Sequence, residues 1–165
     1  MTLEHLLHTI PPIYDRNSKI LILGSFPSVK SREVSFYYGH PQNRFWRVLA
    51  AVLGCAVPSS NEEKTALLHS HNIALWDVIK SCDIVGSSDS SIKNVVPNDI
   101  GVILSSCGIR QIYSNGKTSE KLFNKYIKDT VGRDTVALPS TSPANASYNL
   151  ERLTDSWSVI KNNIR

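Results

Sequence analysis

One segment of the sequence gathers aromatic rings, an amide and basic side chains: Phe36-Tyr-Tyr-Gly-His-Pro-Gln-Asn-Arg-Phe-Trp46. Phe45 and Trp46 are expected in the core face of the helix that follows. Three consecutive aromatic residues, Phe36 to Tyr38, cannot all face one core from a loop. Aromatic faces with basic neighbours suit a ligand that has a flat ring to stack on and phosphate groups to be neutralised. A nucleobase flipped out of its duplex is one such ligand.

Other chemistries that the sequence superficially suggests are not supported by its residue spacing. Gly116-Lys-Thr118 resembles the end of a phosphate-binding loop, but that motif needs a glycine at position 111, which is Gln111. Ser140 lacks the flanking glycines of a nucleophile elbow. The three cysteines lie 27 and 25 residues apart, and the histidines form no His-Glu-x-x-His pair. We therefore expect no metal site and no cofactor.

Positive charge is concentrated in two parts of the chain. The net charge is +4, from 18 Lys and Arg against 14 Asp and Glu, and the basic residues cluster within 29–47 and 110–133. Such zones bind a polyanion or simply form a solvated helix face, and charge alone leaves both open. If basic residues face a duplex, affinity should fall steeply with salt. The candidates for such contacts are Lys30, Arg32, Arg44 and Lys117.

The elements that must position these residues follow from hydrophobic periodicity. Short apolar runs predict strands at 19–24, 73–76, 111–114 and 135–138. Helical spacing predicts helices at 3–10, 45–53, 60–69, 117–128 and 150–164, with a short one after Pro97. Segments 25–42 and 81–91 are expected to be loops. Strands that alternate with helices indicate an open α/β sheet of four mainly parallel strands.

Length and composition limit the number of domains and the class of protein. The 165 residues suit one domain, 1–165, and no apolar run approaches the roughly 18 residues that a membrane span needs. The N-terminus has no secretory cleavage pattern. We expect a cytoplasmic protein.

Four segments directly follow the predicted strands and should share one crevice, because ligands of open parallel sheets bind at the carboxyl ends of the strands. These segments are Gly24–Ser28, Trp76–Ile79, Asn115–Thr118 and Leu138–Pro143.

Three motifs resemble one known family. Gly24-Ser-Phe-Pro-Ser28, Tyr37-Tyr-Gly-His-Pro-Gln-Asn-Arg-Phe-Trp46 and Leu138-Pro-Ser-Thr-Ser-Pro-Ala144 are similar to the uracil-DNA glycosylase superfamily, and most closely to its hypoxanthine-DNA (deoxyinosine) glycosylase branch. The resemblance runs from about Ile20 to the end. It implies a three-layer sandwich with a four-stranded, mainly parallel sheet between helices. It also implies monofunctional hydrolysis of the N-glycosidic bond of a flipped, deaminated nucleotide.

Two departures from the family pattern affect catalysis. Better-known branches carry an Asp or Asn that holds the attacking water where this chain has Phe26, and some carry a histidine where it has Leu138. The resemblance implies that Asn43 supplies the catalytic amide instead. A plain alternative is that Asn43 only caps the helix that begins near Phe45.

The resemblance also assigns other residues. Phe26 and Tyr37 would stack on the base with Tyr38 beside them. Asp77 would read a base edge or only cap a local turn, and His40 would assist with water or phosphate or only shape a turn. Flanking phosphates would be bound by Ser28, Lys117, Ser140, Thr141 and Ser142.

The expected partner is damaged DNA, duplex or single-stranded, bound by a monomer that is nucleoid-associated, or nuclear in a eukaryote. Two alternatives stay open at this point: a uracil- or mismatch-specific glycosylase, and a catalytically silent DNA-binding module of the same fold, which the residues Phe26 and Leu138 favour.

Overall fold

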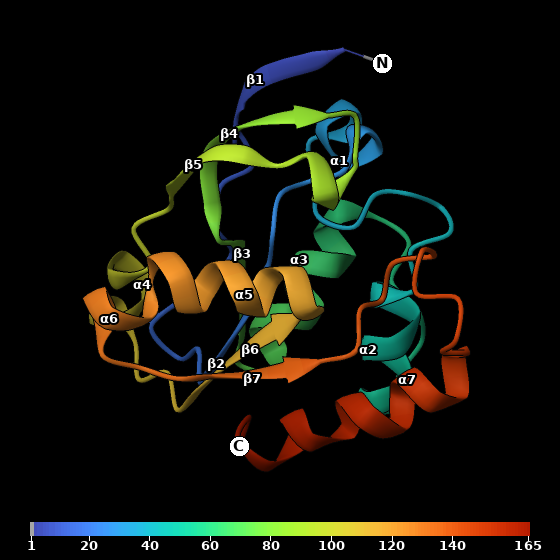
Figure 1. The fold of residues 1–165 in the computed structure, drawn as a ribbon. Coiled ribbons are helices and arrows are strands. Elements are labelled where there is room, and N and C mark those ends of the chain that lie inside the picture. Colours follow the sequence, from blue (N-terminus) through green and yellow to red (C-terminus); the bar gives the residue numbers. More distant parts are fainter. Residues whose placement is uncertain (1) are drawn as a thin grey trace.

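A four-stranded parallel sheet forms the centre of the protein, as seen in a computed structural model that describes residues 2–165 (Figure 1). Its strands are β2 (Ile20–Gly24), β3 (Ile73–Asp77), β6 (Gln111–Asn115) and β7 (Thr135–Leu138). Their order is β3-β2-β6-β7, and every neighbouring pair is parallel. All five residues of β2 are buried, as expected for a central strand covered on both faces. The predicted open sheet is confirmed.

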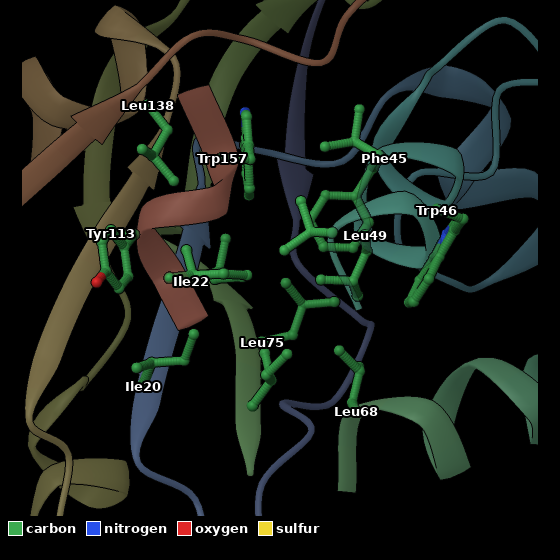
Figure 2. Close-up of a cluster of buried hydrophobic side chains, with 14 of the residues drawn as sticks. Ile20, Ile22, Phe45, Trp46, Leu49, Leu68, Leu75, Tyr113, Leu138 and Trp157 are labelled. Carbon is green, nitrogen blue, oxygen red and sulfur yellow. The ribbon is translucent and has the colours of Figure 1, made fainter. Parts of the chain in front are cut away.

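Helices cover both faces of this sheet, which gives the predicted three layers (Figure 1). One layer contains α2 (Phe45–Leu53), α3 (Asn61–Ser70) and α7 (Leu150–Trp157). Their apolar residues pack with alternate β2 residues, Ile20 and Ile22, in one buried cluster. Figure 2 shows Trp157 pointing toward Phe45 of α2 in that cluster.

The opposite layer contains α4 (Gly101–Ser106), α5 (Lys117–Tyr126) and α6 (Lys128–Val131). It packs on the other β2 residues, Leu21 and Leu23, through Phe123 and Ile103. The helix predicted at 117–128 is thus divided between α5 and α6. The helix predicted at 150–164 ends at Trp157 and continues as a 3-10 helix, η2 (Ser158–Asn162).

A second, smaller sheet contradicts the helix predicted at 3–10. Strands β1 (Leu3–Leu7), β4 (Ile79–Val85) and β5 (Lys93–Pro97) form an antiparallel sheet in the order β1-β4-β5. The helical spacing of apolar residues is misleading here, since Leu3 and Leu7 are 52% and 63% exposed. A short helix that stops at two prolines is only marginally stable. The segment instead makes its backbone hydrogen bonds with the edge of β4.

Both predicted loops also contain regular structure. The segment 25–42 includes helix α1 (Val29–Val34), whose N-cap Ser28 accepts a hydrogen bond from the Ser31 amide. The segment 81–91 begins inside β4 and ends with the 3-10 helix η1 (Asp89–Ser91). Only residues 86–88 of that segment lie outside these elements. The prediction failed here because serine-rich composition hid the alternation of a strand.

In the described part of the chain, the helices are all too short or too polar to cross a membrane.

Candidate active site

A cavity of about 390 Å³ opens at the carboxyl ends of the central strands. Its volume is typical of small-ligand pockets, which range over about 300–1,000 Å³. Residues at or just after the ends of all four strands line it: Gly24–Ser28, Asp77, Asn115 and Ser140–Ser142. Further lining residues are Ser31, Tyr37, Tyr38, Asn43, Ser87–Ser90 and Ala144. The structure thus brings the predicted strand-end segments together.

The floor of the cavity lies where Gly24 and Asp77 pair at the ends of β2 and β3. A Cβ atom on Gly24 would collide with Asp77 Oδ1 and lie 3.0 Å from the Tyr38 hydroxyl oxygen. Glycine is required here because two oxygen atoms approach the backbone closely. A carboxylate oxygen and a hydroxyl oxygen therefore lie together at the floor.

Asp77 is held from behind the cavity. Its Oδ2 atom is 2.7 Å from His8 Nε2, and its backbone carbonyl accepts a 2.9 Å hydrogen bond from Asn98 Nδ2. The alternative role of Asp77 as a local cap is wrong, because its side chain bonds to His8 rather than to a nearby backbone amide. Sequence reasoning missed His8, which lies 69 residues away in the chain.

Phe26 and Tyr37 form an aromatic wall. Both side chains are largely buried, yet both line the cavity. The Tyr37 hydroxyl donates to the Pro11 carbonyl oxygen at 2.8 Å, and the Arg32 guanidinium lies 5.7 Å from the Phe26 ring centroid. Burial raises the pKa of Tyr37, and the charge of Asp77 adds to the increase. The hydroxyl therefore stays protonated at neutral pH.

Tyr38 contributes a hydroxyl group rather than a free ring face. Its backbone is left-handed (φ 52°), and its ring stacks on Phe45 with centroids 4.1 Å apart. The buried hydroxyl approaches Asn115, but within residues 2–165 it has no partner in full hydrogen-bonding geometry. Burial, followed by the charge of Asp77, raises the pKa of Tyr38. A protonated hydroxyl is therefore available to a ligand.

Asn43 uses its side-chain oxygen within the protein. Asn43 Oδ1 accepts from the Phe45 amide at 2.9 Å and from the Thr141 hydroxyl at 2.9 Å. The first bond is made at the start of α2, but the N-cap residue of that helix is Arg44, which makes no side-chain cap, so Asn43 precedes the cap position. Because both acceptor positions are occupied, the amide nitrogen Nδ2 is the group that Asn43 can offer to the cavity that it lines.

Thr141 holds the side-chain amide of Asn43 in place and is itself held by Asn115. Asn115 Nδ2 donates to Thr141 Oγ1 at 3.0 Å, and Asn115 Oδ1 accepts from the Thr141 amide at 3.1 Å. The Thr141 side chain is fully buried between Asn115 and Asn43, so the prediction that Thr141 contacts DNA phosphate is wrong. Asn115 was predicted only as part of a strand-end segment, and its position directly after the strand predicted at 111–114 was the available signal; it is the last residue of β6.

Arg44 holds the loop that follows β7. Its guanidinium donates to the carbonyl oxygens of Thr141, Ser142, Asn145 and Tyr148. A charged donor with four carbonyl partners is a structural anchor. The expectation that Arg44 faces the duplex is therefore wrong.

The other predicted phosphate ligands differ in their positions. Ser28, Ser140 and Ser142 line the cavity. Lys117 is exposed at the start of α5 and lies outside the cavity lining. His40 is also exposed and outside the lining, and its Nδ1 accepts from the Gln42 amide at 3.1 Å, as a turn residue would.

The loop between β4 and β5 provides a wall that sequence reasoning did not foresee. Ser87–Ser90 line the cavity. Ser25 Oγ donates to Asp89 Oδ1 at 3.3 Å, and the Val29 amide donates to Ser87 Oγ at 2.9 Å. Asp89 is exposed at the cavity mouth, but the protein atoms on its other sides desolvate it and raise its pKa.

Residues 2–165 contain no group of three His, Cys, Asp or Glu side chains arranged to hold a metal ion.

Comparisons with known proteins agree with this geometry. The family model described as the Uracil DNA glycosylase superfamily matches residues 11–162. A relative from Methanosarcina barkeri, named hypoxanthine DNA glycosylase, is 36% identical over 137 residues, which cover 82% of this chain and 85% of the relative. A second, of the same name, from Methanosarcina acetivorans is 34% identical over 152 residues, 91% of this chain and 94% of the relative.

A solved structure is also similar. The solution NMR structure of a Methanosarcina acetivorans protein, described as a candidate uracil DNA glycosylase, has a TM-score of 0.79 and 33% identity. The similarity covers 92% of this chain and 94% of that chain. The chain belongs to the uracil DNA glycosylase superfamily, which confirms the resemblance seen in the sequence.

Proposed function

We propose that the protein removes hypoxanthine from deoxyinosine-containing DNA and leaves an abasic site. The observation that carries the proposal is the Asn43 amide, fixed at the cavity by Thr141 and Asn115 within a glycosylase fold. The names of the two relatives from Methanosarcina support the choice of base.

The proposed reaction is hydrolysis. The bond between N9 of the purine and C1′ breaks, the purine takes the electron pair, and the sugar acquires oxocarbenium character. Water forms the new bond to C1′ and loses a proton, and uptake of a proton by the departing purine gives the neutral base. A fixed N–H donor such as Asn43 Nδ2 contributes by orienting the water through its lone pair, or by stabilising negative charge on the departing base.

The aromatic wall and the floor hold the flipped base in this proposal. Phe26 and Tyr37 present ring surface, and burial keeps both rings in place. Asp77 and the Tyr38 hydroxyl contact the polar edge of the base. Stacking of this kind contributes about 1–3 kcal/mol per base in single-stranded complexes.

Phosphate contacts are assigned to Ser28, Ser140 and Ser142 at the cavity and to Lys117 beside it. Ser140 Oγ and Ser142 Oγ accept from backbone amides at 3.1 and 3.2 Å, and each O–H is left to donate. We propose that His40 only shapes its turn. The protein would act as a monomer in the compartment that holds the DNA.

A single-turnover panel tests the assignment. Oligonucleotides containing hypoxanthine, uracil, xanthine or only normal bases are incubated with excess protein, and abasic sites are measured after alkali. Hypoxanthine release without strand cleavage before alkali is the expected result. Preferential release of uracil would replace the proposed base.

A catalytically silent DNA-binding module is the second candidate. It is favoured by Leu138, which is buried in the core and cannot assist a leaving group as a histidine would. DNA binding without release of any base in the panel would establish this alternative.

A further inference from the structure

His8 lies directly behind the wall of the cavity, just after strand β1. Its Nε2 atom is 2.7 Å from Asp77 Oδ2, and the two side chains are 2% and 5% exposed. His8 itself does not line the cavity, whereas Asp77 does. A buried carboxylate that loses its partner is strongly destabilised, so this contact decides where the Asp77 side chain can lie.

The same imidazole ring packs on the aromatic wall. Its centroid is 6.0 Å from that of Phe26, in an edge arrangement, and 6.2 Å from that of Tyr37. One residue outside the cavity therefore contacts three residues that line it.

The second sheet fixes the position of His8. Its backbone amide donates to the Lys80 carbonyl at 2.7 Å, directly after the Leu7–Ser81 pair of β1 and β4. Further along, the carbonyls of Ile10 and Pro11 accept from the Tyr37 hydroxyl. The N-terminal segment is thus a support for the cavity.

This arrangement leaves one oxygen of Asp77 for a ligand. Oδ2 is taken by His8, and Oδ1 reaches the floor beside Gly24, close to the Tyr38 hydroxyl. Deamination of adenine replaces an amino group and a bare ring nitrogen by a carbonyl and an N–H. A carboxylate acceptor beside a hydroxyl donor is complementary to that N–H and carbonyl pair.

We infer that His8 is a positioning residue that holds the Asp77 carboxylate as the acceptor for the ring N–H of a deaminated base. The inference rests on the proposed function. His8 acts through Asp77 and does not touch the base.

The first test uses His8→Phe, which keeps a ring against Phe26 and Tyr37 but donates no hydrogen bond. Single-turnover release of hypoxanthine should fall by about 10- to 100-fold, the usual effect of losing a hydrogen bond to a charged group. His8→Gln, which retains an N–H donor, should recover part of the rate. Equal losses in both variants would overturn the inference.

A matched control lies in β1, three residues before His8. His5 Nδ1 is 2.7 Å from Asp83 Oδ1, but this pair is exposed and lies outside the cavity lining. His5→Phe should leave the rate unchanged. A loss equal to that of His8→Phe would show that any change in β1 lowers activity, and would overturn the inference.

A double-mutant cycle identifies the route of the effect. In an Asp77→Ala background, His8→Phe should change the rate by no more than roughly 2-fold, because its partner is already gone. If the rate of the double variant is instead lowered by the product of the two single losses, His8 acts independently of Asp77, which contradicts the inference.

A substrate whose base lacks the proposed hydrogen-bonding groups gives a separate readout. 2′-Deoxynebularine carries a purine ring without the carbonyl and the ring N–H, so its release should not depend on His8. Equal slowing on nebularine and hypoxanthine would indicate general damage to the cavity and overturn the inference. Failure of the wild-type protein to release hypoxanthine would instead refute the proposed function, so the two failures are distinguishable.

Discussion

The oxygen and the nitrogen of the Asn43 side-chain amide have different surroundings. Its oxygen serves the start of α2 and the Thr141 hydroxyl, and its nitrogen is left for the cavity. The bonds have one direction, from the Asn115 amide through the Thr141 hydroxyl to Asn43 Oδ1. A flipped Asn43 amide would place an N–H group against the Phe45 backbone N–H, which can only donate.

Asn43→Asp separates these two functions. Aspartate keeps an oxygen for both hydrogen bonds but removes the N–H donor, so the protein should keep a melting temperature close to that of the wild type. Single-turnover base release should fall by about 10²-fold or more, equivalent to about 2.7 kcal/mol on the barrier.

The control is Asn149, which caps α7 by accepting from the Arg152 amide, outside the cavity lining. Asn149→Asp should preserve the rate. An Asn43→Asp protein with wild-type kinetics would show that the amide nitrogen has no catalytic role.

Thr141→Val tests whether this residue positions Asn43 or binds DNA. Valine has a similar shape but lacks the hydroxyl, so two half-buried side-chain amides lose a partner, which costs about 1–3 kcal/mol of unfolding free energy. Base release should slow while DNA affinity, measured by fluorescence anisotropy, stays constant. Weakened affinity with an unchanged rate would restore the phosphate-binding role.

At the scale of elements, prediction succeeded where the local pattern and tertiary packing agree. Helix α2 begins and ends as its apolar face predicts, and α3, predicted at 60–69, begins at Asn61 with Ser60 as a cap that accepts from the Glu63 amide. Strand β1 was misread because its hydrogen-bond partner, β4, lies far along the chain, with Leu3 opposite Val85 and Leu7 opposite Ser81. Apolar spacing alone does not reveal such a partner.

The β4–β5 loop should respond to pH through Asp89. Its pKa is raised by desolvation in the folded state, so the folded state binds a proton more tightly than the unfolded state. Stability from this group is present at low pH and is lost as pH rises through the raised pKa.

Asp89→Asn removes this loss. Its melting temperature should exceed that of the wild type at neutral pH, and the difference should vanish as the pH falls toward the ordinary value of 3.8. A melting temperature below that of the wild type at pH 7 would show that the Ser25 contact needs the charge.

At the scale of the whole molecule, the parallel sheet and the convergence of its strand ends could be predicted because they follow from the order of elements. The supporting residues could not. His8, Asn115 and the Ser87–Ser90 wall depend on pairs far apart in the sequence, such as His8 with Asp77, and no local pattern marks them. Arg44 was misassigned because the charge of a side chain does not show whether it points toward solvent or into the protein.

Salt dependence of DNA binding tests the revised charge assignment. Each phosphate contact contributes about 0.9 to the slope of log affinity against log salt for duplex DNA. Lys117→Ala should therefore lower the slope by roughly 0.9. Lys128→Ala, at an exposed lysine that pairs with Asp134, should leave the slope unchanged. Identical slopes in the wild type and Lys117→Ala would remove Lys117 from the interface.

The anchoring of Arg44 has a mechanical consequence. It joins the start of α2 to the loop after β7 through four carbonyls, whereas the Ser87–Ser90 wall is tied to its neighbours through serine hydroxyls and the Arg32–Gly86 contact. The two sides of the cavity therefore differ in compliance. If the proposed function holds, we expect an extrahelical nucleotide to meet a stiff side that carries Asn43, and the clearance for its passage to come from displacement of the serine-rich side.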